Sequence, residues 1–228
     1  MSSVPADVSV VIPVYNGEGY IREAIESVFL QTGLSLEVIV VDNLSSDSTW
    51  DVVGAYGGGV ILASEKRRGA AAARNTGVRL ATGKYLAFLD ADDVWLPGKL
   101  ERQVGKLAAL PGRNLVFGHC QEFHDPGLSA EQRAQFACRS HPYAFLAPSA
   151  CILEREVAQR IGEFPEVTAG EFIAWYGWAQ SLGIGTSVIP EVCVRRRVHA
   201  QNTTRDRQTL AGFPLAAKWL LDRRRQIL

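Results

Sequence analysis

The chain has 228 residues and a formal net charge of zero, and 21% of its residues are charged while 47% are hydrophobic. These values exclude a disordered chain and suit a globular protein with a sizeable core. The neutral balance, without a recurring basic and aromatic pattern, argues against nucleic-acid binding. The charge is uneven, because residues 195–228 hold nine Arg or Lys against two Asp or Glu. This basic end predicts either an anionic ligand nearby or a solvated helix face.

The amino-terminal sequence MSSVPADVSV lacks the basic region and long apolar core of a signal peptide. No apolar run approaches the ~20 residues that a membrane-spanning helix needs. We therefore expect a cytoplasmic protein without an integral membrane segment. The four cysteines are widely spaced and form no CxxC motif, which favours reduced thiols over disulfides or a zinc site.

The first 112 residues alternate between short apolar runs and amphipathic segments. Strands are predicted at 8–12, 36–41, 60–63 and 85–89, and helices at 19–29, after the capping residues 45–49, from about 69, and from 96 to 111. This order is typical of β-α-β units. It predicts an α/β, Rossmann-like fold with a mainly parallel central sheet flanked by helices.

The second half of the sequence is less regular. It predicts a strand at 115–118, turns and helical pieces at 125–142, a return to the sheet at 145–153, a helix at 170–183 and a final helix from Pro214 to Arg225. The segment RRRVHAQNTT, at 195–204, is predicted to be a loop. No internal repeat or linker is visible, so we expect one domain over residues 1–228.

The predicted strand at 85–89 runs directly into three carboxylates, Asp90, Asp92 and Asp93. Charges at the carboxyl end of a strand lie where open α/β sheets bind their ligands. Crowded carboxylates are relieved by protonation or by a cation. Carboxylate oxygens select hard ions, and Mg²⁺ is commonly held by one or two carboxylates together with substrate phosphates. The cluster therefore predicts a site for a metal ion and a diphosphate.

An ordered set of motifs resembles the inverting family-2 glycosyltransferases of the GT-A fold. The matching segments are VSVVIPVYNG at 8–17, EVIVVDNLSSDST at 37–49, GAAAARNTG at 69–77, ATGKYLAFLDADDVW at 81–95, GEFPE at 162–166, GEF at 170–172 and PEVCVRRRVHAQNT at 190–203. The resemblance implies a nucleotide-sugar-binding half at 1–112 and an acceptor-binding half at 113–228. It also implies a UDP-sugar donor and a divalent cation, Mn²⁺ or Mg²⁺.

The resemblance further implies roles for single residues. Base and ribose would be bordered by Pro13, Tyr15 and Asn16, with Asp42 accepting a hydrogen bond from the base, and Arg74 would approach the phosphates. Asp90 and Asp92 would hold the ribose and the metal, with His199 near the metal and Arg197 adding positive charge beside the diphosphate. Asp93 would support this pair or cap the next helix. Separately, the aromatic cluster of Trp175, Tyr176 and Trp178 on a predicted helix is mostly expected in the core, and we expect Trp175 alone to line the site.

Two positions depart from the family pattern. Asp42 is followed by Asn43-Leu44 where a second Asp and a Gly are common. The Asp that commonly takes the acceptor proton is also missing, because Phe172 follows Glu171 and Ala174 precedes Trp175. Three explanations stay open: Glu171 is the base, the chain is inactive by nature or by replacement of an Asp at 174, or another group acts.

Partners and alternatives follow from the same residues. The acceptor is not predicted, so a peptide, a glycan, a lipid and a small molecule all remain open, as does a homodimer. One alternative is a nucleotide-sugar-binding protein without transferase activity. A nucleotidyltransferase is less favoured, because PVYNGEGYIRE at 13–23 lacks the Gly-rich signature with Lys or Arg that such enzymes would carry after the first strand.

Overall fold

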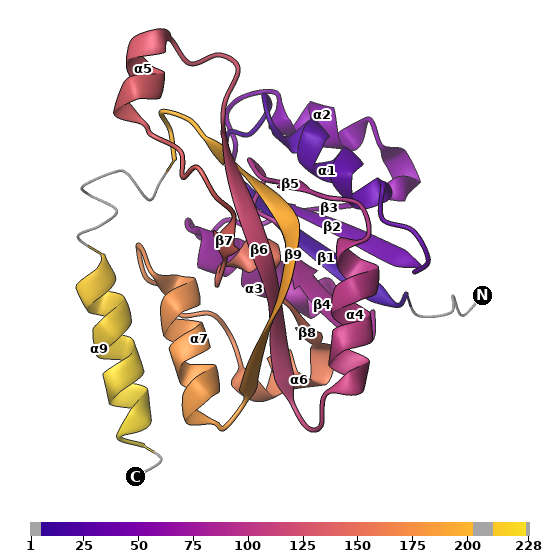
Figure 1. Ribbon diagram of the computed structural model, residues 1–228, viewed down its shortest axis with the longest axis vertical. Helices are drawn as coiled ribbons and strands as arrows, with labels where there is room; N and C mark the ends of the chain where they lie inside the picture. The colour runs from indigo at the N-terminus through magenta and orange to yellow at the C-terminus, as the bar shows by residue number, and fades with distance from the viewer. Residues whose placement is uncertain (1–5, 203–211, 227–228) are drawn as a thin grey trace.

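The computed structural model describes residues 6–202 and 212–226, which form a curled sheet covered by helices (Figure 1). The strands follow the order β3-β2-β1-β4-β8-β6-β9-β5, and β7 pairs with β6. Their bounds are β1 Val8–Val14, β2 Leu36–Asp42, β3 Ile61–Ser64, β4 Tyr85–Phe88, β5 Val94–Trp95, β6 Asn114–His124, β7 Tyr143–Ala144, β8 Ile152–Glu154 and β9 Gly185–Val198. The predicted α/β architecture with a mainly parallel sheet is confirmed.

The first four strands of this order are all parallel. Val8 of β1 lies opposite Leu36 of β2 and Tyr85 of β4, and Ile39 of β2 lies opposite Ile61 of β3. All seven residues of β1 are buried, which explains why its sequence shows no alternation of apolar and polar residues. Because the strands run in one direction, their carboxyl ends meet at one edge of the sheet.

The other strands make the sheet mixed. β8 runs antiparallel to β4 and β6, while β6 and β9 run parallel from the pair Asn114 and Gly185 to the pair His124 and Val198. Figure 1 shows these two long strands crossing the molecule side by side. The predicted loop at 195–204 is wrong in its first part, because the three arginines lie in β9. Their charges are tolerated within the sheet because each guanidinium has an acidic or aromatic neighbour.

The helices bear out most of the expected segments. Their bounds are α1 Ile21–Phe29, α2 Thr49–Gly54, α3 Ala70–Leu80, α4 Lys99–Ala109, α5 Ala130–Gln135, α6 Arg155–Ile161, α7 Glu171–Ser181 and α9 Phe213–Arg224, with short 3₁₀ turns at Gly57–Gly59 and Pro148–Ala150. Helix α6 was not predicted from the sequence. Within the described ranges, no helix has the length and apolar character needed to cross a membrane.

Helix α3 lies unusually close to the sheet at Gly77. A Cβ atom at this position would overlap the side chain of Val11 in the middle of β1. The missing side chain lets the helix approach the strand, and this approach fixes the height of Arg74, one turn earlier on α3, above the sheet.

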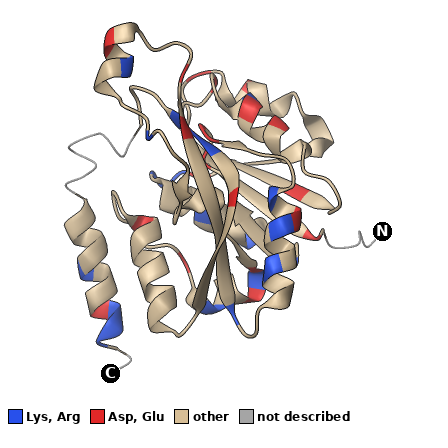
Figure 2. Cartoon of the chain, viewed as in Figure 1, with Lys and Arg blue, Asp and Glu red and all other residues tan. Residues whose placement is uncertain are grey.

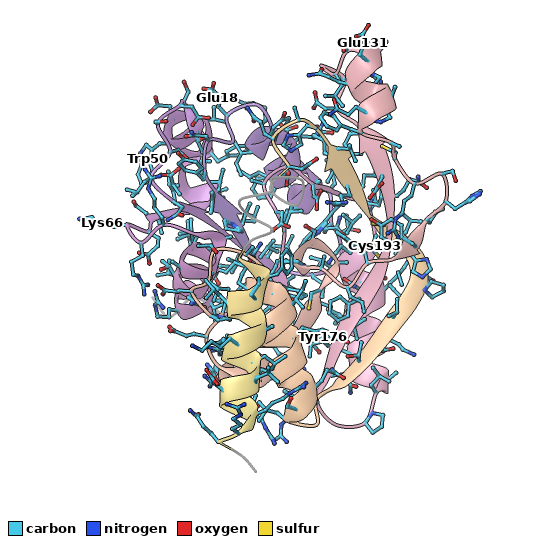
Figure 3. All side chains as sticks on the ribbon, turned by 90° about the vertical axis from the view of Figure 1, so that its left-hand side faces the viewer. Glu18, Trp50, Lys66, Glu131, Tyr176 and Cys193 are labelled. Atoms are coloured by element: carbon cyan, nitrogen blue, oxygen red, sulfur yellow. The ribbon has the colours of Figure 1, made fainter. Side chains whose placement is uncertain are left out.

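Helix α7 is preceded by its N-cap residue Gly170, whose φ of 75° is in the left-handed region that favours glycine. Its aromatic residues form a core, and the Trp175 ring stacks on Phe164 with centroids 4.5 Å apart. Trp175 is almost fully buried, so the expectation that it lines the site is wrong: it packs in the core and donates from Nε1 to the Gly162 carbonyl oxygen at 2.7 Å. Figure 3 shows Tyr176 on the same helix, near β9, where its hydroxyl lies 2.9 Å from Thr186 Oγ1.

Candidate active site at the carboxyl ends of the strands

Hydrogen bonds join the loop that follows β1 to the loop that follows β2. The Asn16 backbone N–H donates to Ser45 Oγ at 2.9 Å, and Asn16 Oδ1 accepts from the Ser46 N–H at 2.8 Å. Asn16 has a φ of 48°, a conformation that asparagine tolerates better than most residues. Pro13 is buried in β1, whereas the Tyr15 ring is 53% exposed, with the Arg68 guanidinium 5.9 Å from its centroid. The edge therefore offers an aromatic face to a flat ligand.

Asp42, at the end of β2, is buried beside this face. Its Oδ2 accepts a hydrogen bond from the Ser45 N–H at 3.1 Å. Its Oδ1 is also buried, and within the described part of the chain no donor reaches it. Burying a carboxylate oxygen without a hydrogen-bond donor costs free energy. The unpaired Asp42 Oδ1 therefore indicates a place where a ligand could donate an N–H group.

Asn43 has a structural role that explains why the chain departs from the family pattern here. Its amide nitrogen donates to the carbonyl oxygens of Glu65 at 2.8 Å and Arg67 at 2.7 Å, and its Oδ1 accepts from the Gly69 N–H at 2.7 Å. An aspartate could not make the two donations. Asn43 thus ties down the segment between β3 and α3 that carries Arg68.

Three charged residues from different elements meet beyond the end of β4. Arg74 of α3 is only 4% exposed. Its Nη2 lies 2.6 Å from Asp90 Oδ1, and its Nη1 lies 2.6 Å from Glu171 Oε1 at the start of α7. Arg74 Nε is buried, and no acceptor for it lies among the described residues. The Arg74 guanidinium thus contacts both Asp90, which is predicted to help hold the sugar donor, and Glu171, the candidate base.

Asp92 faces a different partner. Its Oδ2 lies 2.9 Å from His199 Nε2 and accepts from Asn202 Nδ2 at 3.2 Å. The Asn202 side chain also accepts the His199 N–H at 2.7 Å, so it orients both the histidine and the carboxylate. The Tyr20 ring lies 4.8 Å from the imidazole, centroid to centroid. The predicted pair of Asp92 and His199 is therefore adjacent.

Asp93 is directed into the protein. Its Oδ2 accepts from Ser149 Oγ at 2.7 Å, and its Oδ1 accepts from the Arg197 N–H at 3.2 Å. Burial raises the pKa of Asp93 well above its usual range, and the Asp92 and Asp90 carboxylates add to this rise. Burial also raises the pKa of Asp90, although the Arg74 guanidinium opposes the rise. Asp93 supports the turn that presents the other two carboxylates, while the residue that caps α4 is Gly98.

The three arginines of β9 reach different neighbours. Arg197 is buried: its Nε donates to the Asp92 carbonyl oxygen at 3.1 Å, its Nη1 lies 3.2 Å from Asp125 Oδ2, and its Nη2 contacts Glu23. Arg196 Nη1 lies 2.9 Å from Glu122 Oε1. Arg195 covers the Phe123 ring. Arg197 therefore stabilises the turn at residues 90–93 by hydrogen bonds from its backbone and its side chain.

The basic end of α9 lies away from these residues. Arg224 Nε donates to Ser181 Oγ at 2.7 Å at the far end of α7 from Glu171, and Arg223 stacks on Trp178 and Trp219. Figure 2 places these charges at the carboxyl end of α9. The arginines at the end of α9 therefore pack on α7. Another part of the basic segment, at 203–211, lies outside the described residues.

The predicted metal ligands could hold a hard cation only if a bound substrate supplied the remaining ligand atoms. Asp90 and Asp92 supply carboxylate oxygens, which suit Mg²⁺ or Mn²⁺, and His199 adds an imidazole nitrogen, a ligand that later transition metals prefer. Within the described ranges, no group of three such side chains is close enough to hold an ion by itself. A cation bound here would therefore need further ligands, such as substrate phosphates.

The sequence did not single out two residues that shape the site. Asn202 could have been found, because it follows His199 by three residues in the polar segment that had already been selected. Ser149 had no such signal. It lies near β8, and it holds both Asp93 and the Asp90 N–H, which donates to Ser149 Oγ at 3.1 Å.

Comparison with known proteins finds relatives both by sequence and by structure. Residues 9–162 match the sequence profile of glycosyl transferase family 2, a range that ends before Glu171. The chain is 29% identical over 212 residues to the uncharacterized glycosyltransferase RP339 of Rickettsia prowazekii, covering 86% of this chain and 65% of that protein. It is 29% identical over 200 residues to the Escherichia coli UDP-Glc:alpha-D-GlcNAc-diphosphoundecaprenol beta-1,3-glucosyltransferase WfaP, covering 85% of this chain and 78% of that protein.

A solved structure shows the same fold. The mannosyltransferase PcManGT of Pyrobaculum calidifontis, in complex with GDP-Man and Mn²⁺, superposes with a TM-score of 0.71 at 24% identity, over 95% of this chain and 65% of that one. The expected GT-A architecture is confirmed by this likeness.

Proposed function

Because the chain belongs to glycosyl transferase family 2, a family of inverting transferases, we propose that it moves a sugar from a UDP-sugar to an acceptor hydroxyl. The reaction depends on a divalent cation and inverts the configuration of the anomeric carbon. Since the chain spans only 65% of RP339, this proposal concerns the site that the chain itself carries.

The proposed donor is supported by the groups at the ends of β1 and β2. Asp42 Oδ1 is a buried acceptor without a donor, which suits the N–H group of a uracil ring, and the exposed Tyr15 ring suits its flat face. WfaP carries UDP-Glc in its name. We propose UDP-glucose as the donor to test first.

The proposed cation site consists of Asp90, Asp92 and His199. When bound there, Mn²⁺ or Mg²⁺ would stabilise the negative charge that develops on the departing diphosphate. Two of the residues are already held in place, because Asn202 orients His199 and Asp92, and Arg197 supports the Asp92 carbonyl. PcManGT binds Mn²⁺ with a nucleotide sugar, which supports the choice of Mn²⁺ as the first probe.

The observation that carries the proposal is the placement of Glu171 by Arg74 beside Asp90. In the proposed step, the acceptor oxygen attacks the anomeric carbon and the bond from that carbon to the diphosphate oxygen breaks. The hydroxyl proton passes to the Glu171 carboxylate. Ala174, one turn further along α7, is buried and carries no carboxylate, so Glu171 at the helix start is the proposed base.

The acceptor is proposed from the same relatives. WfaP acts, by its name, on a GlcNAc unit linked to diphosphoundecaprenol. A sugar hydroxyl on a lipid-linked saccharide is therefore the proposed acceptor class.

Transfer assays with Glu171→Ala and Ala174→Asp test which residue is the base. Loss of general-base catalysis costs about 10² to 10⁴-fold in rate, so Glu171→Ala should lose that much activity while Ala174→Asp gains little. A large gain by Ala174→Asp, with no loss by Glu171→Ala, would show that the chain binds donor without transferring it and that position 174 is the vacant place of the base. No transfer by any of the three proteins would favour the same binding-only function.

A further inference from the structure

Arg74 joins the two halves of the site by one buried guanidinium. Its two terminal nitrogens reach different carboxylates, Asp90 after β4 and Glu171 at the start of α7, each at 2.6 Å. These partners are 16 and 97 residues away in the sequence. The planar guanidinium offers donors in fixed directions, so the two contacts set the two carboxylates in one geometry.

The backbone around Arg74 is held as firmly as its side chain. Asn75 Nδ2 donates to the Phe164 carbonyl oxygen at 3.0 Å, and its Oδ1 accepts the Phe164 N–H at 2.8 Å. Gly77 seats the same helix on β1. The start of α7 is fixed separately, because a Cβ at Gly170 would lie 2.9 Å from Phe213 Cδ1. Both ends of the ion pair between Arg74 and Glu171 therefore have little freedom to move.

Nothing else in the described hydrogen-bond network fixes the Glu171 side chain. Gly170, which precedes it, has no side chain to cap the helix, and the hydrogen bond recorded for the Glu171 carboxylate comes from Arg74. A flexible glutamate at a helix start would lose rotamer entropy each time it reached the acceptor. A glutamate held by a rigid guanidinium is already oriented.

We propose that Arg74 is a positioning residue for Glu171, which it holds at a fixed place relative to Asp90 and hence to the sugar donor. This inference rests on the proposed function, in which Glu171 is the base. It differs from the expectation that Arg74 serves the phosphates, because the guanidinium acts here through two carboxylates. A lysine would keep the charge, but its single ammonium group could not reproduce the bridge.

The test is a double-mutant cycle of wild type, Arg74→Lys, Glu171→Gln and the double variant. The kcat for UDP-glucose turnover with Mn²⁺ is measured for each protein, and the affinity for UDP with Mn²⁺ is measured by calorimetry. We expect Arg74→Lys to lower kcat at least tenfold in the wild-type background and less than threefold in the Glu171→Gln background. Any loss of affinity that comes from Asp90 should be equal in both backgrounds.

Arg79→Lys is the matched control. Arg79 lies on the same helix and also pairs with a glutamate of the second half, since its Nη1 lies 2.7 Å from Glu163 Oε1, but it is far more exposed than Arg74. We expect its kcat to stay within twofold of wild type. Thermal unfolding of all variants checks that they fold, and a folding defect common to both backgrounds cancels in the cycle.

Each remaining outcome counts against the inference in a distinguishable way. If Arg74→Lys lowers kcat by the same factor in both backgrounds, Arg74 does not act through Glu171 while the proposed function stands. The same holds if Arg74→Lys leaves kcat unchanged. If Glu171→Gln has the kcat of wild type, the proposed base is wrong and the positioning role is wrong with it.

Discussion

Leu44 is held in a backbone conformation that leucine rarely adopts. Its φ of 65° is in the left-handed region, directly after Asp42 and Asn43. Such a conformation costs a non-glycine residue about 1–2 kcal/mol. The family pattern has Gly at this place, so the chain bears a strain that a single substitution can remove.

We predict that Leu44→Gly raises the free energy of unfolding by about 1 kcal/mol, because glycine adopts positive φ without strain. Chemical denaturation measures the change. Leu146→Gly is the matched control, since Leu146 is 44% exposed against 40% for Leu44 and does not have a positive φ. It should be destabilised. Equal destabilisation of the two variants would mean that the Leu44 side chain contributes more than its strain costs.

Lys99 is a fully buried amine at the start of α4. It is 0% exposed, its Nζ donates to Gln103 Oε1 at 2.8 Å, and the same atom lies 3.9 Å from the centroid of the Trp95 ring. Burial disfavours the ammonium form and lowers the pKa of Lys99 to about 8. The folded pKa is therefore below that of the unfolded chain, about 10.4.

The order of these two pKa values decides how the stability of the fold changes with pH. Between these two values the unfolded chain binds more protons, so the penalty is fully present below pH 8 and fades as the pH rises towards 10.4. We predict that Lys99→Met stabilises the protein, relative to wild type, by about 2 kcal/mol more at pH 7 than at pH 10. Urea denaturation at the two pH values gives the difference. Equal differences at both values would mean that Lys99 keeps its ordinary pKa in the fold.

The contact between α3 and β1 sets the position of Arg74. Gly77→Ala would place a methyl group in the side chain of Val11. Overpacking of this kind typically costs about 1–3 kcal/mol, which exceeds the gain of up to about 1 kcal/mol from the helix propensity of alanine. We predict a net loss of about 1 kcal/mol in the free energy of unfolding and a lower kcat.

Gly105→Ala provides the control, because Gly105 lies on α4 with no atom within 4 Å of the added Cβ. It should gain about 0.5–1 kcal/mol from helix propensity. Both values come from the same denaturation experiment. Equal stabilisation of the two variants would show that α3 can shift away from β1 without loss.

The elements also show what the sequence could predict. Strands β1, β2 and β4 were predictable because each is a short apolar run followed by a polar turn, and the acidic cluster at 90–93 identified the edge that carries the site. The strand at 195–198 was not, because three consecutive arginines resemble a solvated loop. Their partners, such as Glu23 and Glu122, lie more than 70 residues away in the sequence, and no local pattern reveals such pairs.

The site depends on contacts between parts of the chain that are distant in the sequence. Arg74 and Glu171 were each selected from the sequence, but their ion pair was not foreseen, and neither was the link from His199 to Asp92 through Asn202. Motif resemblance assigned these residues one by one. Their mutual orientation depends on packing that brings β9 and α7 against the first half of the chain.

A nucleotide and a cation should therefore stabilise the whole protein together. We predict that UDP with Mn²⁺ at about 100 times the dissociation constant raises the free energy of unfolding by about 2.7 kcal/mol, while either alone gives far less. Asp92→Asn should remove this cooperation. Asp51→Asn, a change on the exposed face of α2, should leave it intact. Equal stabilisation by UDP in Mn²⁺ and in EDTA would contradict a shared site.

The proposed role of Glu171 as the base of an inverting reaction can be tested without knowing the acceptor. In the absence of an acceptor, water can take its place, so proton NMR can follow the first glucose released from UDP-α-glucose with Mn²⁺. We predict that wild type releases β-glucose first, and that Glu171→Gln releases it about 10² to 10⁴ times more slowly. Initial release of α-glucose would show that the reaction does not invert the anomeric carbon, and equal rates for the two proteins would show that Glu171 is not the base.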